Sequence, residues 1–105
     1  MIFVETPIFS EEVLKLLPDE DYRALQLALL FRPESGQVIP RTGGLRKLRW
    51  NLPRSGKRGG LGIIYYWHKP DDILYMLWLY RKGRQEDLTP QQSKLLSKLV
   101  KDYLA

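Results

Sequence analysis

Two apolar runs near the middle of the chain read LGIIYYW at residues 61–67 and ILYMLWLY at residues 73–80. Both are short, almost continuous in apolar side chains, and rich in Ile, Tyr and Trp, which is typical of strands buried on both faces of a sheet. The segment HKPDD at residues 68–72 separates them and contains residues that favour a turn. The sequence therefore predicts an antiparallel pair of central strands.

The segment before this pair predicts an opening strand followed by two helices. Residues 2–6 form a short apolar run, as expected of a strand. Ser10, which two glutamates follow, favours a helix that starts there and ends before Pro18. Acidic residues at 19–21 and a stripe of Leu and Tyr predict a second helix that ends before Pro33. The two helices should form a hairpin.

A third central segment, residues 45–52, alternates between two faces of a predicted strand. Leu48 and Trp50 fall on one face, whereas Lys47 and Arg49 fall on the other. The two basic side chains should therefore project together.

The C-terminal segment predicts a last helix. Thr89 is a suitable N-cap, Pro90 suits the first helical position, and Gln92 completes a capping box. Its apolar stripe is wide enough that the helix must dock on the sheet or on a partner. The predicted fold is a single α+β domain over residues 1–105, mainly an antiparallel sheet with an N-terminal helical hairpin and a C-terminal helix.

Composition excludes several kinds of chemistry. The chain has no cysteine, so disulfides, a thiol nucleophile and thiolate metal sites are excluded. A single histidine excludes both a multi-histidine zinc site and a mechanism with two histidines as acid and base. We find no signal-peptide pattern and no apolar run of the roughly 20 residues that span a bilayer. A soluble cytoplasmic protein without membrane contact is expected.

Positive charge is concentrated in one stretch. Residues 35–70 contain eight Lys or Arg residues and no Asp or Glu, although the whole chain carries only +5. Aromatic residues interleave with these cations, and that combination suits single-stranded nucleic acid, because cations attract phosphates and aromatic faces stack on bases. A solvated cationic face over ordinary core aromatics is the alternative interpretation.

Specific motifs lie within this stretch. They are TGGLRKLR at residues 42–49, GKRGG at residues 56–60 and IIYY at residues 63–66, and YRK follows at residues 80–82. With the predicted order of elements, they make nearly the whole chain resemble the HigB branch of the RelE superfamily of toxins from bacterial toxin-antitoxin operons. The resemblance implies a RelE-like fold and a ribosome-dependent endoribonuclease that cuts mRNA without a metal or other cofactor. It also implies neutralisation by a cognate protein antitoxin.

The resemblance also suggests roles for individual residues. Lys47 and Arg49 match a basic pair that the family projects from this strand, so they are expected to stabilise the scissile phosphate. Proton transfer by Lys47 is a second expected role, because a lysine can lower its pKa towards neutrality. Lys82 matches the family's strand end and is the third candidate catalytic residue. The residues expected to bind RNA or the ribosome are Arg46, Arg54, Lys57, Arg58, Tyr80, Arg81 and Arg84.

Each of these assignments has a simpler alternative. Lys47 and Arg49 would also suit an ordinary solvated strand face, and the basic loop at residues 53–60 would suit a solubilising hairpin tip. Most aromatic residues of the two central strands should be core residues, with Tyr80 the best candidate to stack on a base. For Arg84, a charged turn position is favoured over catalysis.

One position departs from the family pattern. Members commonly carry an arginine just before IIYY, where it holds the transition-state phosphate, and this chain has Gly62 there. Three explanations stay open: Arg58 or another loop cation compensates, the activity is weakened, or an arginine was replaced so that a toxic chain could be produced. On this pattern, Gly62→Arg is expected to raise toxicity and cleavage.

Two other functions compete with the nuclease. Toxins of the ParE branch share the fold, lack the nuclease residues and act on DNA gyrase, and Gly62 favours that interpretation. A nucleic-acid-binding domain without catalysis is the third alternative. The basic residues and the motifs of residues 42–66 favour the nuclease.

Overall fold

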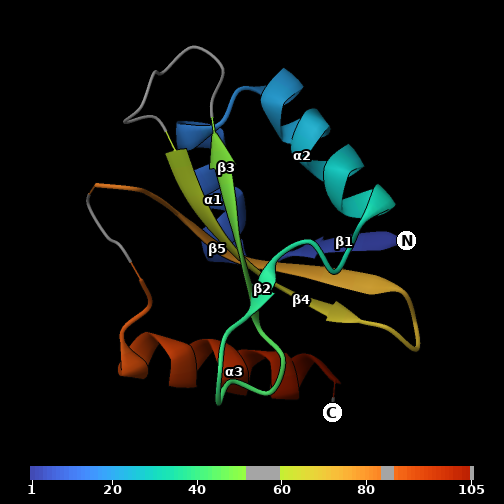
Figure 1. The fold of residues 1–105 in the computed structure, drawn as a ribbon, viewed down its shortest axis with the longest axis vertical. Helices are drawn as coiled ribbons and strands as arrows, with labels where there is room; N and C mark the ends of the chain where they lie inside the picture. Colours follow the sequence, from blue (N-terminus) through green and yellow to red (C-terminus); the bar gives the residue numbers. More distant parts are fainter. Residues whose placement is uncertain (52–59, 84–86, 105) are drawn as a thin grey trace.

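The strand pair predicted at residues 61–80 forms the middle of a five-stranded sheet in the computed structural model, which describes residues 1–51, 60–83 and 87–104 (Figure 1). The strands are β1 (Ile2–Glu5), β2 (Gln37–Val38), β3 (Arg46–Asn51), β4 (Gly60–His68) and β5 (Ile73–Arg81). The helices are α1 (Pro7–Leu16), α2 (Asp19–Phe31) and α3 (Pro90–Leu104). The predicted α+β class, helical hairpin and C-terminal helix are confirmed.

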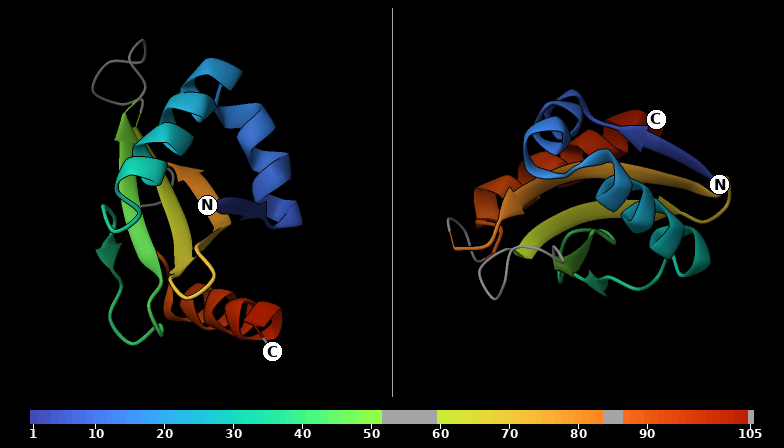
Figure 2. Two further views of the ribbon diagram at one scale, coloured as in Figure 1. Left: turned by 90° about the vertical axis from the view of Figure 1, so that its right-hand side faces the viewer. Right: turned by 90° about the horizontal axis from the view of Figure 1, so that it is seen from above.

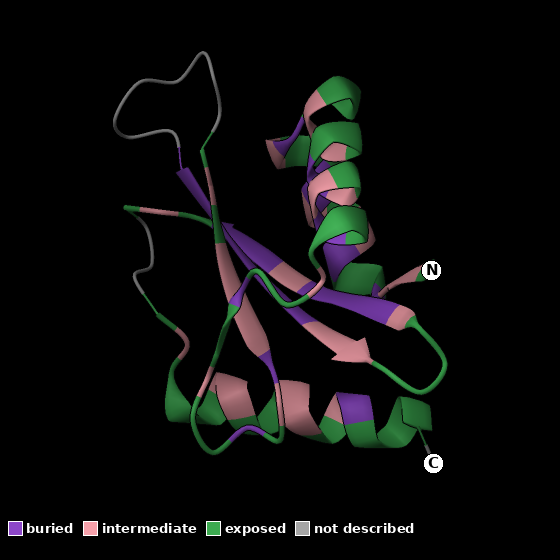
Figure 3. Cartoon of the chain, turned by 45° about the vertical axis from the view of Figure 1, so that its right-hand side comes forward, coloured by how far each residue is buried: buried purple, intermediate pink, exposed green. Residues whose placement is uncertain are grey.

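The sheet has the order β1-β5-β4-β3-β2. β2, β3, β4 and β5 pair antiparallel in succession, and β1 pairs parallel with β5. β4 and β5 are therefore central, as their apolar runs predict, and most of their residues are buried (Figure 3). The two-residue strand β2 was not predicted, because a strand of that length shows no alternation in the sequence.

Helices cover the two faces of the sheet. Alternate residues of β4 and β5, such as Ile63 and Leu79, pack with α1 and α2, while Ile64 and Leu77 share a second core cluster with Val100 of α3. Figures 1 and 2 show the helical hairpin and α3 on opposite sides of the strands. β4 and β5 thus lie between two apolar layers.

The N-terminal helix begins earlier than predicted. Thr6, not Ser10, is the N-cap of α1, and Pro7 follows it at the start of the helix. The Thr6 hydroxyl accepts a hydrogen bond from the Phe9 amide (3.1 Å) and donates one to the Leu77 carbonyl of β5 (2.7 Å). Ser10 lies within the helix and donates to Glu5. The helix begins after Thr6 because the Thr6 side chain both caps the helix and hydrogen-bonds to the sheet.

The predictions for the last helix are confirmed at its start. The Gln92 amide donates to the Thr89 hydroxyl (3.1 Å) and the Thr89 amide donates to the Gln92 side chain (3.0 Å), which is a capping box. Leu96 and Val100 dock on the sheet, whereas Leu95 remains 68% exposed. Within the ranges that the structure describes, no helix is long and apolar enough to cross a membrane.

The double role of Thr6 gives a first prediction. Thr6→Val keeps the shape of the side chain but leaves the Leu77 carbonyl and the Phe9 amide without their partner, so we expect a loss of about 2 kcal/mol in the free energy of unfolding. Urea titration followed by circular dichroism measures it. Thr6→Ser, which keeps the hydroxyl, is the control and should lose clearly less. Equal losses in the two variants would contradict this role.

Candidate functional site

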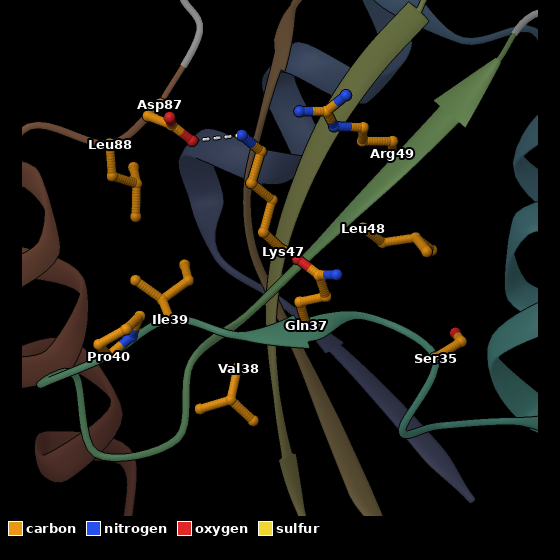
Figure 4. Close-up of a pocket in the computed structure, with 10 residues that line it drawn as sticks. All are labelled: Ser35, Gln37, Val38, Ile39, Pro40, Lys47, Leu48, Arg49, Asp87 and Leu88. Carbon is orange, nitrogen blue, oxygen red and sulfur yellow. Dashed lines mark hydrogen bonds and ion pairs between the residues drawn. The ribbon is translucent and has the colours of Figure 1, made fainter.

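A pocket of about 820 Å³ opens beside β3, between the edge strand β2 and the segment that leads into α3 (Figure 4). Alternation along β3 places Lys47 and Arg49 on the face of the sheet that α3 covers, as predicted. The lining residues are Ser35, Gln37, Val38, Ile39, Pro40, Lys47, Leu48, Arg49, Asp87 and Leu88. The charged side chains of this described lining are two cations and one carboxylate.

Lys47 is the best enclosed of these charged side chains. Its side chain is 14% exposed, and its ammonium forms an ion pair with the carboxylate of Asp87. Burial lowers the pKa of Lys47, but hydrogen bonds to Asp87 and Tyr80 outweigh burial, so its pKa lies above the ordinary 10.5. Lys47 is therefore a stable cation here. This direction is opposite to the lowered pKa that proton transfer at neutral pH requires.

Arg49 extends to the same side of β3 as the Lys47 ammonium (Figure 4). Unlike Lys47, it is exposed. The hydrogen bond and charge of Lys47, together with the charge of Arg49, lower the pKa of Asp87. Lys47 and Asp87 are therefore both ionised at neutral pH, and the cations of the pocket present donors that can hold an anion.

Gly62 lies opposite both Arg49 and Tyr80 in the sheet register. A Cβ atom at Gly62 would lie 2.3 Å from Cζ of Tyr80 and 2.6 Å from its hydroxyl, so the tyrosine ring covers the glycine. This packing explains how a glycine is accommodated in a buried strand. An arginine could enter at position 62 only if the Tyr80 side chain moved, so the expected gain from Gly62→Arg meets a steric obstacle.

Tyr80 itself is a core residue with a polar end. It is 6% exposed, belongs to the core cluster beneath α3 and lies 5.1 Å from Trp78 between ring centroids. Its ring is thus covered by its neighbours. The predicted stacking role would require a ring that is exposed to a base. Its hydroxyl instead contributes to the raised pKa of Lys47.

Arg46 lies on the other face of β3 from Lys47. Its guanidinium donates to the carbonyls of Glu34 (3.0 Å) and Gly36 (2.8 Å), in the segment between α2 and β2. The predicted RNA-binding residue therefore has its donors directed at the backbone. It holds the segment that forms the pocket wall.

The remaining predicted residues lie at one end of the sheet or outside the described ranges. Arg81 ends β5 and is exposed, while Lys82 is half-buried, with its amide donating to the Gly60 carbonyl (3.0 Å). Lys82 is not among the described residues that line the pocket. Arg54, Lys57, Arg58 and Arg84 fall outside the residues that the structure describes.

Sequence reasoning missed three polar residues of the pocket: Asp87, Gln37 and Ser35. Asp87 is 40 positions from Lys47, and no spacing pattern joins them. Gln37 belongs to the edge strand that was not predicted. The one sequence signal for the ion pair between Lys47 and Asp87 is that an acidic residue follows the last strand in a chain rich in cations.

Fold and site together define a small α+β protein with a cationic pocket on one face of its sheet. The chain matches no protein-family model. Among the described residues, no three His, Asp or Glu side chains gather closely enough to hold a metal ion. Lys47, Arg49 and Asp87 supply the charged groups of the described pocket lining.

The contact of Gly62 with Tyr80 generates the second prediction. Gly62→Ala should lower the free energy of unfolding by about 1–3 kcal/mol, because the new methyl group overlaps the tyrosine ring. In a Tyr80→Ala background the same change should cost far less. Gly60→Ala is the matched control in the same strand, since its methyl group would meet the flexible Lys82 side chain (3.1 Å), the Asn51 side chain (3.2 Å) and, at ordinary contact distance, the Trp50 carbonyl (3.8 Å). Denaturant titrations of the double-mutant cycle measure the coupling, and a cost of Gly62→Ala that is independent of Tyr80 would contradict it.

Proposed function

We propose that this protein is a toxin of the RelE superfamily, HigB branch, that cleaves mRNA on the ribosome in the cytoplasm and is neutralised by a cognate antitoxin. The observation that carries the proposal is the pair Lys47 and Arg49, side by side on β3 and lining one pocket. The motifs of residues 42–66 and the order of helices and strands add to it. Single-stranded RNA is the substrate that such a pocket and a basic sequence suit.

The proposed reaction uses the RNA's own 2′-hydroxyl as nucleophile. Its oxygen bonds to phosphorus while the bond from phosphorus to the 5′-oxygen breaks, which leaves a 2′,3′-cyclic phosphate and a 5′-hydroxyl. The 2′-hydroxyl loses a proton to water and the leaving oxygen gains one. Negative charge grows on the phosphorane oxygens, so preorganised cations beside them lower the barrier.

Lys47 and Arg49 are suited to this charge stabilisation. Lys47 has a raised pKa and so keeps its positive charge throughout the reaction, and Arg49 offers a planar fork of donors to phosphate oxygens. Gly62 contributes no cation, and Tyr80 fills its place. Lys82 is the third candidate, because it follows β5 at the same end of the sheet.

The third prediction concerns proton transfer in the pocket. Because none of the described lining residues is suited to move protons at neutral pH, the ribosome has to orient the 2′-hydroxyl. Cleavage of mRNA on translating ribosomes should therefore greatly exceed cleavage of the same mRNA when naked. Mapping 5′ ends after incubation with each substrate measures the difference. Equal cleavage of both would overturn ribosome dependence.

A toxin of the ParE type is the alternative function. The observation that favours it is Gly62, whose place beside Arg49 is filled by a phenol instead of a cation. A supercoiling assay with DNA gyrase, run in parallel with the mapping of mRNA ends, separates the two. Gyrase inhibition without new mRNA ends would replace the nuclease by the alternative.

Removing the two cations from the pocket gives the fourth prediction. Lys47→Met and Arg49→Met should each slow single-turnover cleavage of ribosome-bound mRNA by about 10²-fold, the usual effect of losing one donor to a developing oxyanion. Lys69→Met is the control, because it removes the same charge from the turn after β4, away from Lys47. Co-sedimentation with ribosomes reports binding separately. If the variants lost binding but kept the bound-state rate, the pair would be a docking surface.

A further inference from the structure

Asp87 is an exposed carboxylate that reaches an enclosed cation. Its side chain is 77% exposed, whereas the Lys47 side chain that it contacts is 14% exposed. Among the described residues that line the pocket, Asp87 alone is acidic. A largely exposed group thus directs its charge at Lys47, on the same side of β3 as Arg49 (Figure 4).

The next two residues of the chain fix the position of Asp87. Leu88 packs against the core cluster beneath α3, and Thr89 caps the helix. Asp87 therefore stands at a defined place beside the pocket, where the docking of α3 sets its distance from Lys47. The fold thus places the Asp87 carboxylate beside Lys47, and their ion pair is a feature of the sheet face that α3 covers.

A carboxylate bound to Lys47, with Arg49 on the same side of the strand, resembles a bound phosphate. Both groups are anions that accept charge-assisted hydrogen bonds from Lys and Arg. An ion pair with one exposed partner contributes little, about 1 kcal/mol or less, so a stronger anion can displace it. Gln37 adds an amide to the same pocket and can donate to the anion that enters.

We propose that the pocket is a phosphate-binding site whose place Asp87 occupies in the free protein, so that Asp87 competes with RNA phosphate for Lys47 and Arg49. The inference rests on the proposed function for its ligand, a phosphodiester of single-stranded RNA. Competition weakens the binding of any single small anion. A polymer overcomes it because its neighbouring phosphates bind elsewhere at the same time, so Asp87 favours RNA over free phosphate and mononucleotides.

The test is a comparison of two neutralised carboxylates. Asp87→Asn removes the competitor, and Asp102→Asn removes the same charge from the exposed end of α3. The probes are inorganic phosphate, titrated with NMR of the backbone amides, and a fluorescent ten-nucleotide single-stranded RNA, titrated by anisotropy. We expect Asp87→Asn to bind phosphate more tightly than wild type by up to about fivefold, the largest factor that an exposed ion pair accounts for, with no such gain in Asp102→Asn.

A second variant identifies the cation. Lys47→Met combined with Asp87→Asn should lose the gain in phosphate affinity, and Asp87→Ser should reproduce the effect of Asp87→Asn. The proposal is overturned if Asp87→Asn binds phosphate no better than Asp102→Asn, or if the gain survives without Lys47. Thermal unfolding of each variant verifies that it is folded.

Failure of this inference differs from failure of the proposed function. A gain in phosphate affinity without any ribosomal cleavage supports competition between Asp87 and phosphate, and it contradicts the proposed nuclease function. Ribosomal cleavage with no gain in phosphate affinity overturns the competing carboxylate alone.

Discussion

The antiparallel pairing of β4 and β5 is the constraint on which the rest of the structure depends. Both strands are covered on two faces, by α1 and α2 on one side and by α3 on the other. Strands enclosed in this way can carry few polar side chains, because a buried polar group without a partner is costly. The cationic side chains of the pocket therefore lie on β3, where Lys47 and Arg49 are next to the core and still reach solvent.

The core also builds the wall of the pocket. The phenol of Tyr65, buried in β4, donates to the Pro33 carbonyl (2.7 Å) and accepts from the Gly36 amide (2.8 Å). Burial is the main reason that its pKa is raised, so it remains a neutral donor. Together with Arg46, it fixes the segment before β2 and so places Gln37 beside Lys47. A packing residue and a predicted RNA-binding residue thus become positioning groups.

The electrostatics of the pocket follow from unequal exposure. Burial of Lys47 lowers its pKa, but Asp87 and Tyr80 raise it by more, so the net shift is upwards and the ammonium keeps its charge. Tyr80 can do so because Gly62 leaves room for its ring across the strand. Gly62 is thereby linked, through Tyr80, to the pKa of the residue proposed to stabilise the phosphate. The cross-strand pair of Gly62 and Tyr80 thus affects both the packing of the core and the electrostatics of the pocket.

The sequence by itself determined the two central strands, the helical hairpin, the capping box of α3 and the common face of Lys47 and Arg49. These features depend on period, turn residues and caps, which act between residues close in the chain. Only the tertiary structure decided that Thr6 begins α1, that Arg46 binds backbone, that Tyr80 covers Gly62 and that Asp87 reaches Lys47. Each of these contacts joins residues that are distant in sequence or on neighbouring strands. Their partners are set by sheet register and helix docking, which local patterns do not encode.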